Sequence, residues 1–124
     1  MDGTRKSWAK FFSDIFHKKA AGPGIFLLET HVAGLGHIPH IDEIEPTLHV
    51  GDKLRLSREP ENQHDEMAIV VKTAKGVKIG YVPRSSNAVF ARLMDGGKQL
   101  GAKISGKSGQ PGYHYVLIKI YLTD

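Results

Sequence analysis

The side chains best suited to chemistry gather in one short segment of the chain, residues 58–66. Arg58 can pair with a phosphate group, and His64 can stack on a flat ring or change its charge near neutral pH. Asn62 and Asp65 are turn-forming residues whose side chains can accept hydrogen bonds from nearby backbone N–H groups. Because the spacing shows no nucleophile paired with a base, the segment indicates binding rather than catalysis.

The histidines of the sequence do not form a recognisable metal-binding motif. His37 and His40 lie three residues apart, but Pro39 between them disfavours a helix that would put both on one face. No HExxH motif accompanies them, the chain has no cysteine, and it has no GxxxxGKS or GxxxxGKT phosphate-binding loop. We therefore expect no enzyme activity, catalytic residue, metal ion, cofactor or small-molecule substrate.

The distribution of charge sets a condition on any phosphate-binding site. The formal net charge is +4, which favours an anionic partner such as nucleic acid. Residues 1–20 carry five basic and two acidic side chains, so the rest of the chain is close to neutral. Phosphate binding by the rest of the chain would therefore need a local cluster of cations. The candidate cations are Arg58, Lys78, Arg84, Lys103 and Lys107.

Short strands separated by turns are predicted after residue 24. Residues 53–58 alternate, with Leu54 and Leu56 on one face, and residues 113–122 alternate in the same way. The predicted strands are 25–32, 53–58, 67–73, 77–82, 100–105 and 113–122, and residues 106–112 are predicted to be a flexible loop. One helix is expected before the last two strands, with Ser85 or Ser86 as its N-cap and its end near Asp95.

This order of elements predicts a mainly β protein with α elements, an α+β chain. Its architecture would be a small OB-like β-barrel with one inserted helix. Tyr113 and Tyr115, together with Tyr81, could offer an aromatic face to a nucleic-acid base, although a core or surface position is the commoner role of tyrosine.

The first part of the chain, residues 1–24, is expected to be a helix and a Gly/Pro linker, followed by the barrel domain at 25–124. Residues 4–19 place their apolar side chains on one stripe of a helix. This amphipathic helix would cover an open face or end of the barrel, or else dock on a partner protein or a membrane surface. The lack of cysteine and of a long apolar run suits a cytoplasmic protein.

Three segments in this order resemble the HIRAN family of domains, and the resemblance covers residues 25–122. They are VAGLGH at 32–37, REPENQHDEMAIVV at 58–71 and GYVP at 80–83. The family occurs in helicase-like DNA-repair ATPases and as short stand-alone bacterial proteins, and this chain is similar to the second kind. The resemblance implies an OB-like barrel whose pocket holds the 3′ end of single-stranded DNA.

The resemblance also implies roles for individual residues. Asp65 matches an acid that accepts a hydrogen bond from the terminal 3′-hydroxyl, and His64 matches an aromatic residue that stacks on the terminal base. Arg84 lies where family members carry basic residues that reach DNA. Gly36 and His37 replace a basic and an aromatic residue of the helicase-linked members. The glycines of this turn, Gly34 and Gly36, either only form the turn or let a phosphate approach backbone N–H groups.

The sequence therefore predicts a weak, end-selective nucleic-acid-binding module that acts in DNA repair or DNA processing. One stacked base contributes about 1–3 kcal/mol, and a few phosphate contacts would bring the affinity to the micromolar range. The alternative is a protein–protein interaction module that has lost DNA-end binding. The predicted nucleic-acid-binding residues are Gly36, His37, Arg58, Asn62, His64, Asp65, Tyr81, Arg84 and Tyr113.

Overall fold

The computed structural model describes residues 24–123, and the predicted helix at 4–19 lies outside these residues. The described strands are β1 (Ile25–His31), β2 (Lys53–Arg58), β3 (Ile69–Thr73), β4 (Lys78–Tyr81), β5 (Leu100–Gln110) and β6 (Tyr113–Leu122). The helices are α2 (Ile41–Ile44) and α3 (Arg84–Asp95), with two 3-10 turns, η1 (Leu35–His37) and η2 (Glu45–Thr47). No helix among the described residues is long and apolar enough to cross a membrane.

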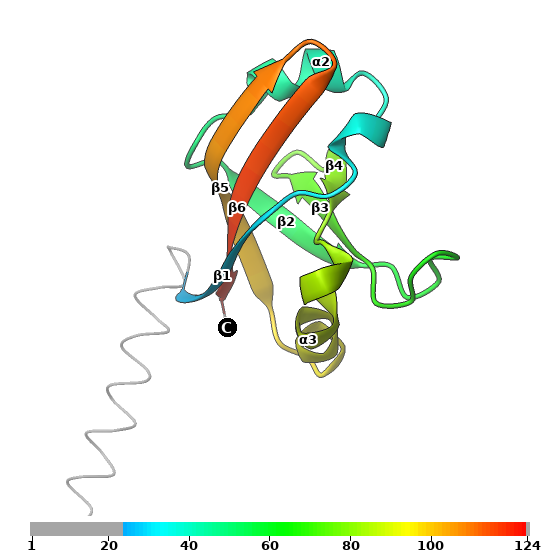
Figure 1. Ribbon diagram of the computed structural model, residues 1–124. Helices are drawn as coiled ribbons and strands as arrows, with labels where there is room; N and C mark the ends of the chain where they lie inside the picture. Colours follow the sequence, from blue (N-terminus) through cyan, green and yellow to red (C-terminus); the bar gives the residue numbers. More distant parts are fainter. Residues whose placement is uncertain (1–23, 124) are drawn as a thin grey trace, which may run out of the picture.

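The six strands form one curled antiparallel sheet in the order β1-β6-β5-β2-β3-β4 (Figure 1). The two edges of the sheet are joined at one point, where Ala33, just after β1, forms an isolated bridge with Tyr81 of β4. The backbone N–H of each residue donates to the carbonyl of the other, at 2.7 and 2.9 Å. The result is a mostly β half-barrel with a helix inserted between β4 and β5, which is consistent with the predicted OB-like fold.

Alternating apolar residues place the core inside the curled sheet. Leu54 and Leu56 of β2 are buried, and Val116, Ile118 and Ile120 of β6 are completely buried, as the alternation predicts. Helix α3 packs against this core through an adjacent pair of buried side chains, Phe90 and Ala91.

The prediction of a flexible loop at 106–112 is wrong, because β5 continues to Gln110 and pairs there with Tyr113 of β6. Only Pro111 and Gly112 form the turn, and Gly112 has the positive φ of 83° that such a turn requires. A side chain at Gly109 would place its Cβ 2.9 Å from Glu45 Oε1. Gly109, one of the glycines that indicate a loop in the sequence, therefore permits a close approach to the neighbouring segment.

That neighbouring segment, residues 34–50, contains short helical turns that the sequence did not predict. The buried Glu45 fixes it to β5, since Lys107 Nζ lies 3.2 Å from Glu45 Oε1. A second contact joins His114 Nε2 to Asp42 Oδ1 at 2.5 Å. Helix α3 also differs slightly, because it begins at Arg84 with Pro83 at its N-cap and not with a serine cap.

Candidate functional site

The loop between β2 and β3 is shaped by the side chain of Asn62. Asn62 Oδ1 accepts hydrogen bonds from the backbone N–H groups of His64, at 2.8 Å, and Asp65, at 3.1 Å. Asn62 Nδ2 donates to Glu59 Oε1 at 3.1 Å, which fixes the amide in this orientation. The turn chemistry predicted for Asn62 is therefore present, and it determines where the two following side chains point.

The carboxylate of Asp65 is held by groups from two elements. Its Oδ1 accepts a bond from the Met67 backbone N–H at 2.9 Å, and its Oδ2 accepts one from Asn87 Nδ2 of α3 at 2.7 Å. Arg84 Nε lies 3.6 Å from the same Oδ2. These bonds, with the Met67 N–H first and then Asn87, lower the pKa of Asp65 below its ordinary value of 3.8. Asp65 is therefore a carboxylate at neutral pH, with its side chain still 21% exposed.

Arg84 is the first residue of helix α3, and its side chain reaches the loop between β2 and β3. Its Nη2 donates to the backbone carbonyl of His64, so the guanidinium joins the helix to the loop. The side chain is nevertheless 70% exposed. Because a guanidinium carries five N–H donors, Arg84 retains donors that face solvent beside the Asp65 carboxylate.

Tyr81 of β4 is held by a chain of hydrogen bonds through its hydroxyl. The hydroxyl donates to Glu59 Oε1 at 2.8 Å and accepts from Lys78 Nζ at 2.7 Å. Burial raises the pKa of Glu59, but the bonds from Asn62 and Tyr81 and the nearby lysines outweigh it and lower that pKa overall. The phenol ring is therefore fixed in position by an ionised partner.

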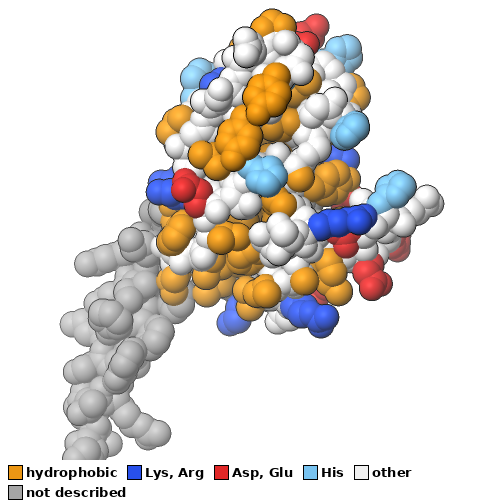
Figure 2. Space-filling view, in the orientation of Figure 1, with side chains coloured by type: hydrophobic (Ala, Val, Ile, Leu, Met, Phe, Trp, Pro, Cys, Tyr) orange, Lys and Arg blue, Asp and Glu red, His pale blue; other side chains and the backbone are white. Residues whose placement is uncertain are grey.

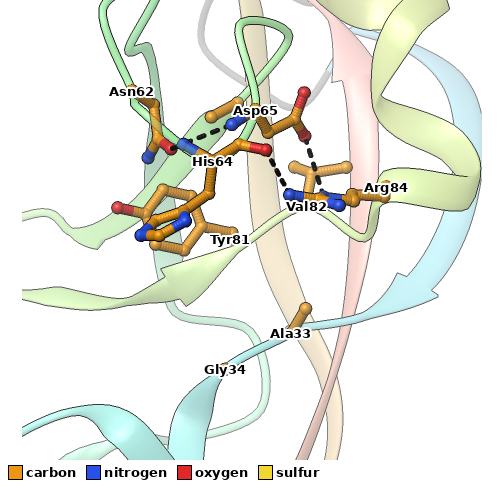
Figure 3. A pocket seen from close by; sticks show the side chains of 9 residues that line it. Ala33, Gly34, Asn62, His64, Asp65, Tyr81, Val82 and Arg84 are labelled. Atoms are coloured by element: carbon orange, nitrogen blue, oxygen red, sulfur yellow. Dashed lines mark hydrogen bonds and ion pairs between the residues drawn. The ribbon is translucent and has the colours of Figure 1, made fainter.

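These side chains line one pocket of about 270 Å³, close to the lower end of the range for small-ligand sites. Figure 3 shows the Asn62–Asp65 loop above it, Arg84 at one side and the Ala33–Gly34 backbone below. The lining residues are Ala33, Gly34, Asn62, His64, Asp65, Ala68, Tyr81, Val82 and Arg84. Five of the predicted site residues, from two separate sequence segments, thus come together here.

Arg58, also predicted to bind nucleic acid, is turned towards the protein instead. Its Nε and Nη2 bind the Asp95 carboxylate at 2.9 and 3.2 Å, and Nη1 and Nη2 donate to the carbonyls of Ala68, at 2.5 Å, and Glu66, at 2.8 Å. The side chain is only 12% exposed. Arg58 therefore joins the loop to the end of α3 and does not line the pocket.

The other predicted residues lie outside the pocket lining. Gly36 and His37 are exposed in η1, two and three residues beyond the pocket residue Gly34. Tyr113 is 63% exposed at the tip of the β5–β6 hairpin. Figure 2 shows hydrophobic side chains gathered over this end of β5 and β6. Tyr115, further along the same strand, stacks on His31 with their ring centroids 6.0 Å apart.

Sequence reasoning missed several residues that form the site. Asn87 is 3% exposed and donates a hydrogen bond to Asp65. It is a polar residue on the same helix stripe as the buried Phe90 and Ala91. A polar residue on an apolar stripe was a usable signal, because a buried amide requires a partner. Ala33 and Gly34 belong to the VAGLGH segment that carries the family resemblance, but they reach the pocket lining through the bridge between Ala33 and Tyr81, which no local pattern predicts.

The pocket offers three kinds of contact. A carboxylate can accept a hydrogen bond from a hydroxyl, a guanidinium can pair with a phosphate, and Ala33, Ala68 and Val82 give an apolar wall for a ring or sugar. Within residues 24–123, no three histidine or acidic side chains are grouped so that they could hold a metal ion.

Comparisons with known proteins agree with this architecture. The family model of the HIRAN domain matches residues 25–123. A crystal structure of a protein from Lactobacillus plantarum, solved by a structural genomics consortium, is 32% identical with a TM-score of 0.67, over 78% of this chain and 95% of that one. The crystal structure of the HIRAN domain of human HLTF is 21% identical with a TM-score of 0.61, over 76% of this chain and 73% of that one. No curated protein sequence matches significantly.

Proposed function

The chain belongs to the HIRAN domain family, and on that basis we propose that its pocket binds the free 3′ end of single-stranded DNA. The observation that carries the proposal is that Asn62, His64, Asp65, Tyr81 and Arg84 line one pocket. Nucleic-acid binding in general follows from the family. The preference for a strand end is the finer statement, and it rests on the chemistry of the pocket.

Asp65 supports a preference for a terminal hydroxyl. Its lowered pKa keeps it ionised, and each carboxylate oxygen has a second lone pair beyond the bonds from Met67 and Asn87. A 3′-hydroxyl can donate to this carboxylate, whereas a 3′-phosphate or a continuing strand would place negative charge against it. The pocket therefore selects both by attraction and by repulsion.

Arg84 and the two rings supply the remaining contacts. The exposed guanidinium of Arg84, beside Asp65, is placed to pair with the phosphate on the 5′ side of the terminal nucleotide. The ring of Tyr81, held by Glu59 and Lys78, gives the terminal base a surface to stack on, and His64 offers a second ring at the pocket mouth. The proposal is binding without catalysis, in DNA repair or DNA processing.

The test is fluorescence anisotropy with two labelled single strands of about ten nucleotides that differ only at the 3′ end, hydroxyl or phosphate. A hydrogen bond to a charged group contributes about 1.5–3 kcal/mol, so the wild type should prefer the hydroxyl by about tenfold to a hundredfold. Asp65→Asn should lose this preference, because an amide keeps an acceptor for the Met67 N–H but does not repel phosphate. Glu66→Gln, an exposed neighbour with the same charge change, should retain it.

Equal binding to both ends that disappears at moderate salt would contradict the proposal. Such binding would be non-specific attraction between lysines and phosphates. The protein–protein interaction alternative would then become the leading account of the family fold in this chain.

A further inference from the structure

Cations that are scattered along the sequence form two rows on the outer face of the sheet. Lys53, Lys103 and Lys119 lie directly opposite one another across β2, β5 and β6. Arg55, Lys72 and Lys78 do the same across β2, β3 and β4. We call this group the cation ladder: Lys53, Arg55, Lys72, Lys78, Lys103 and Lys119.

All six side chains share the face that points away from the core. Lys53 and Arg55 alternate with the buried Leu54 and Leu56 along β2, which places the two cations outside. Their directly opposite partners on the neighbouring strands share that face, because side chains of a cross-strand pair point to the same side of a sheet. The two rows are joined at β2, where Lys53 and Arg55 are two residues apart.

This arrangement is electrostatically unfavourable for the free protein. Lys53 opposite Lys103, Lys103 opposite Lys119, Arg55 opposite Lys72 and Lys72 opposite Lys78 are four pairs of like charge. Like charges directly opposite each other on adjacent strands destabilise a sheet. A bound polyanion would remove this repulsion.

Few acidic side chains in the described part of the chain neutralise the ladder. Among residues 24–123, no ladder cation forms an ion pair within 4.0 Å, whereas Lys107 and Arg84 both do. Glu59 lies near Lys72 and Lys78 at one end, and Glu29 lies opposite Lys119 at the other. Six cations against two acids at the ends give a local positive surface on a nearly neutral domain.

The ladder leads directly to the pocket. Lys72 pairs with Lys78, and the next outward pair along the same two strands is Val70 with Tyr81, which lines the pocket. Lys78 Nζ also lies 4.4 Å from the centre of the Tyr81 ring. In the sheet β2 lies between β5 and β3 (Figure 1), so the row on β2, β3 and β4 is the one nearer to Tyr81 and the row on β2, β5 and β6 follows it across the sheet.

We propose that the cation ladder binds the sugar–phosphate backbone of the single strand whose 3′ end occupies the pocket. The direction of the strand rests on the proposed function, while the ladder itself rests on the register of the sheet. Adjacent strands are about 4.8 Å apart and successive outward residues about 6.7 Å apart, so each phosphate along the path would have a cation within reach of a long side chain. These contacts carry no sequence information, and they would raise affinity with strand length.

The test measures affinity and its salt dependence for a strand of about three nucleotides, which fills only the pocket, and one of about twelve. The variant is Lys53→Gln with Lys103→Gln. Its control is Arg92→Gln with Lys98→Gln, two exposed cations on and after α3 with the same change in charge. Removing two opposed cations should not lower the urea midpoint, so a failure to fold is not expected.

Two lost phosphate contacts should make the log–log salt slope for the long strand shallower by about 1.4. The affinity gap between wild type and variant should therefore shrink about sevenfold between roughly 50 and 200 mM salt. The short strand should bind the variant as it binds the wild type, with the same preference for a 3′-hydroxyl. The Arg92 and Lys98 control should keep the wild-type slope.

Equal slopes for the ladder variant and its control would overturn the proposal, even if the 3′-hydroxyl preference is intact. A ladder effect without any end preference would support the ladder and refute the proposed 3′-end function. If the variant loses binding to phosphatidylserine vesicles and keeps wild-type binding to the long strand, the ladder serves a membrane surface and the proposal is wrong.

Discussion

Replacing Arg58 with alanine should destabilise the fold rather than act directly on ligand binding. Arg58 donates to the carbonyls of Glu66 and Ala68, and Ala68 is only 4% exposed. The Ala68 carbonyl keeps a bond from the Glu59 backbone N–H at 3.0 Å, so the loss is that of two hydrogen bonds from a charged donor, which together stabilise the fold by about 2–4 kcal/mol. The bonds to Asp95 add little, since that carboxylate is half exposed.

Urea unfolding followed by far-UV circular dichroism measures how far Arg58→Ala lowers the free energy of unfolding. Arg58→Lys should recover only part of it, because one ammonium group cannot reproduce the fixed fork that reaches a carboxylate and two carbonyls. The pKa of Asp95, lowered chiefly by its hydrogen bond from Arg58, should rise in both variants when followed by NMR. If Arg58→Ala keeps the wild-type urea midpoint but loses DNA affinity and salt dependence, Arg58 is a phosphate contact and the structural role is refuted.

Three further results are expected. Asn87→Ala should remove about 1.5–3 kcal/mol of stability with its bond to Asp65, and NMR should show the pKa of Asp65 moving up towards 3.8. Because the pKa of Asp65 is depressed in the folded state, the stabilisation by its carboxylate is complete above pH 3.8 and is lost as the pH falls through the lower folded pKa. Asp65→Asn should therefore make the urea midpoint less dependent on pH in this acid range. A pH dependence equal to that of the wild type would contradict the lowered pKa of Asp65. Gly80→Ala should lower the stability by about 3 kcal/mol, because the new Cβ would clash with the Ala33 carbonyl and break the bridge between Ala33 and Tyr81. The control is Gly36→Ala, whose Cβ would meet no atom within 4 Å, so its stability in the same urea assay should stay within about 0.5 kcal/mol of the wild type.

Local patterns in the sequence predict the strands well where burial alternates. Residues 53–58 and 113–122 have the bounds that alternation gives, since one face of each is buried. The pattern fails in β5, where glycine and serine suggest a loop but the chain needs glycine so that Glu45 and His114 can lie close. Segment 34–50 has no clear period, so its short helical turns had no local signal.

The sequence likewise predicts some residues of the candidate site and not others. Asn62, His64 and Asp65 are adjacent in sequence, so the motif that identifies one identifies the others. Arg58 belongs to the same motif, but whether its side chain faces the pocket or Asp95 depends on where α3 ends in space. The cation ladder could not be predicted either, because only the pairing of the strands brings its members together.

The most direct test of the central claim, that the pocket holds a strand end, is NMR chemical-shift mapping with a dinucleotide. A dinucleotide with a free 3′-hydroxyl should shift the backbone amides of Gly34, His64, Asp65 and Arg84 and leave the hairpin tip at Tyr113 unchanged. The same dinucleotide with a 3′-phosphate should cause much smaller shifts at equal concentration, because the Asp65 carboxylate repels it. Shifts of equal size for both ligands, or shifts located away from the pocket, would contradict the account.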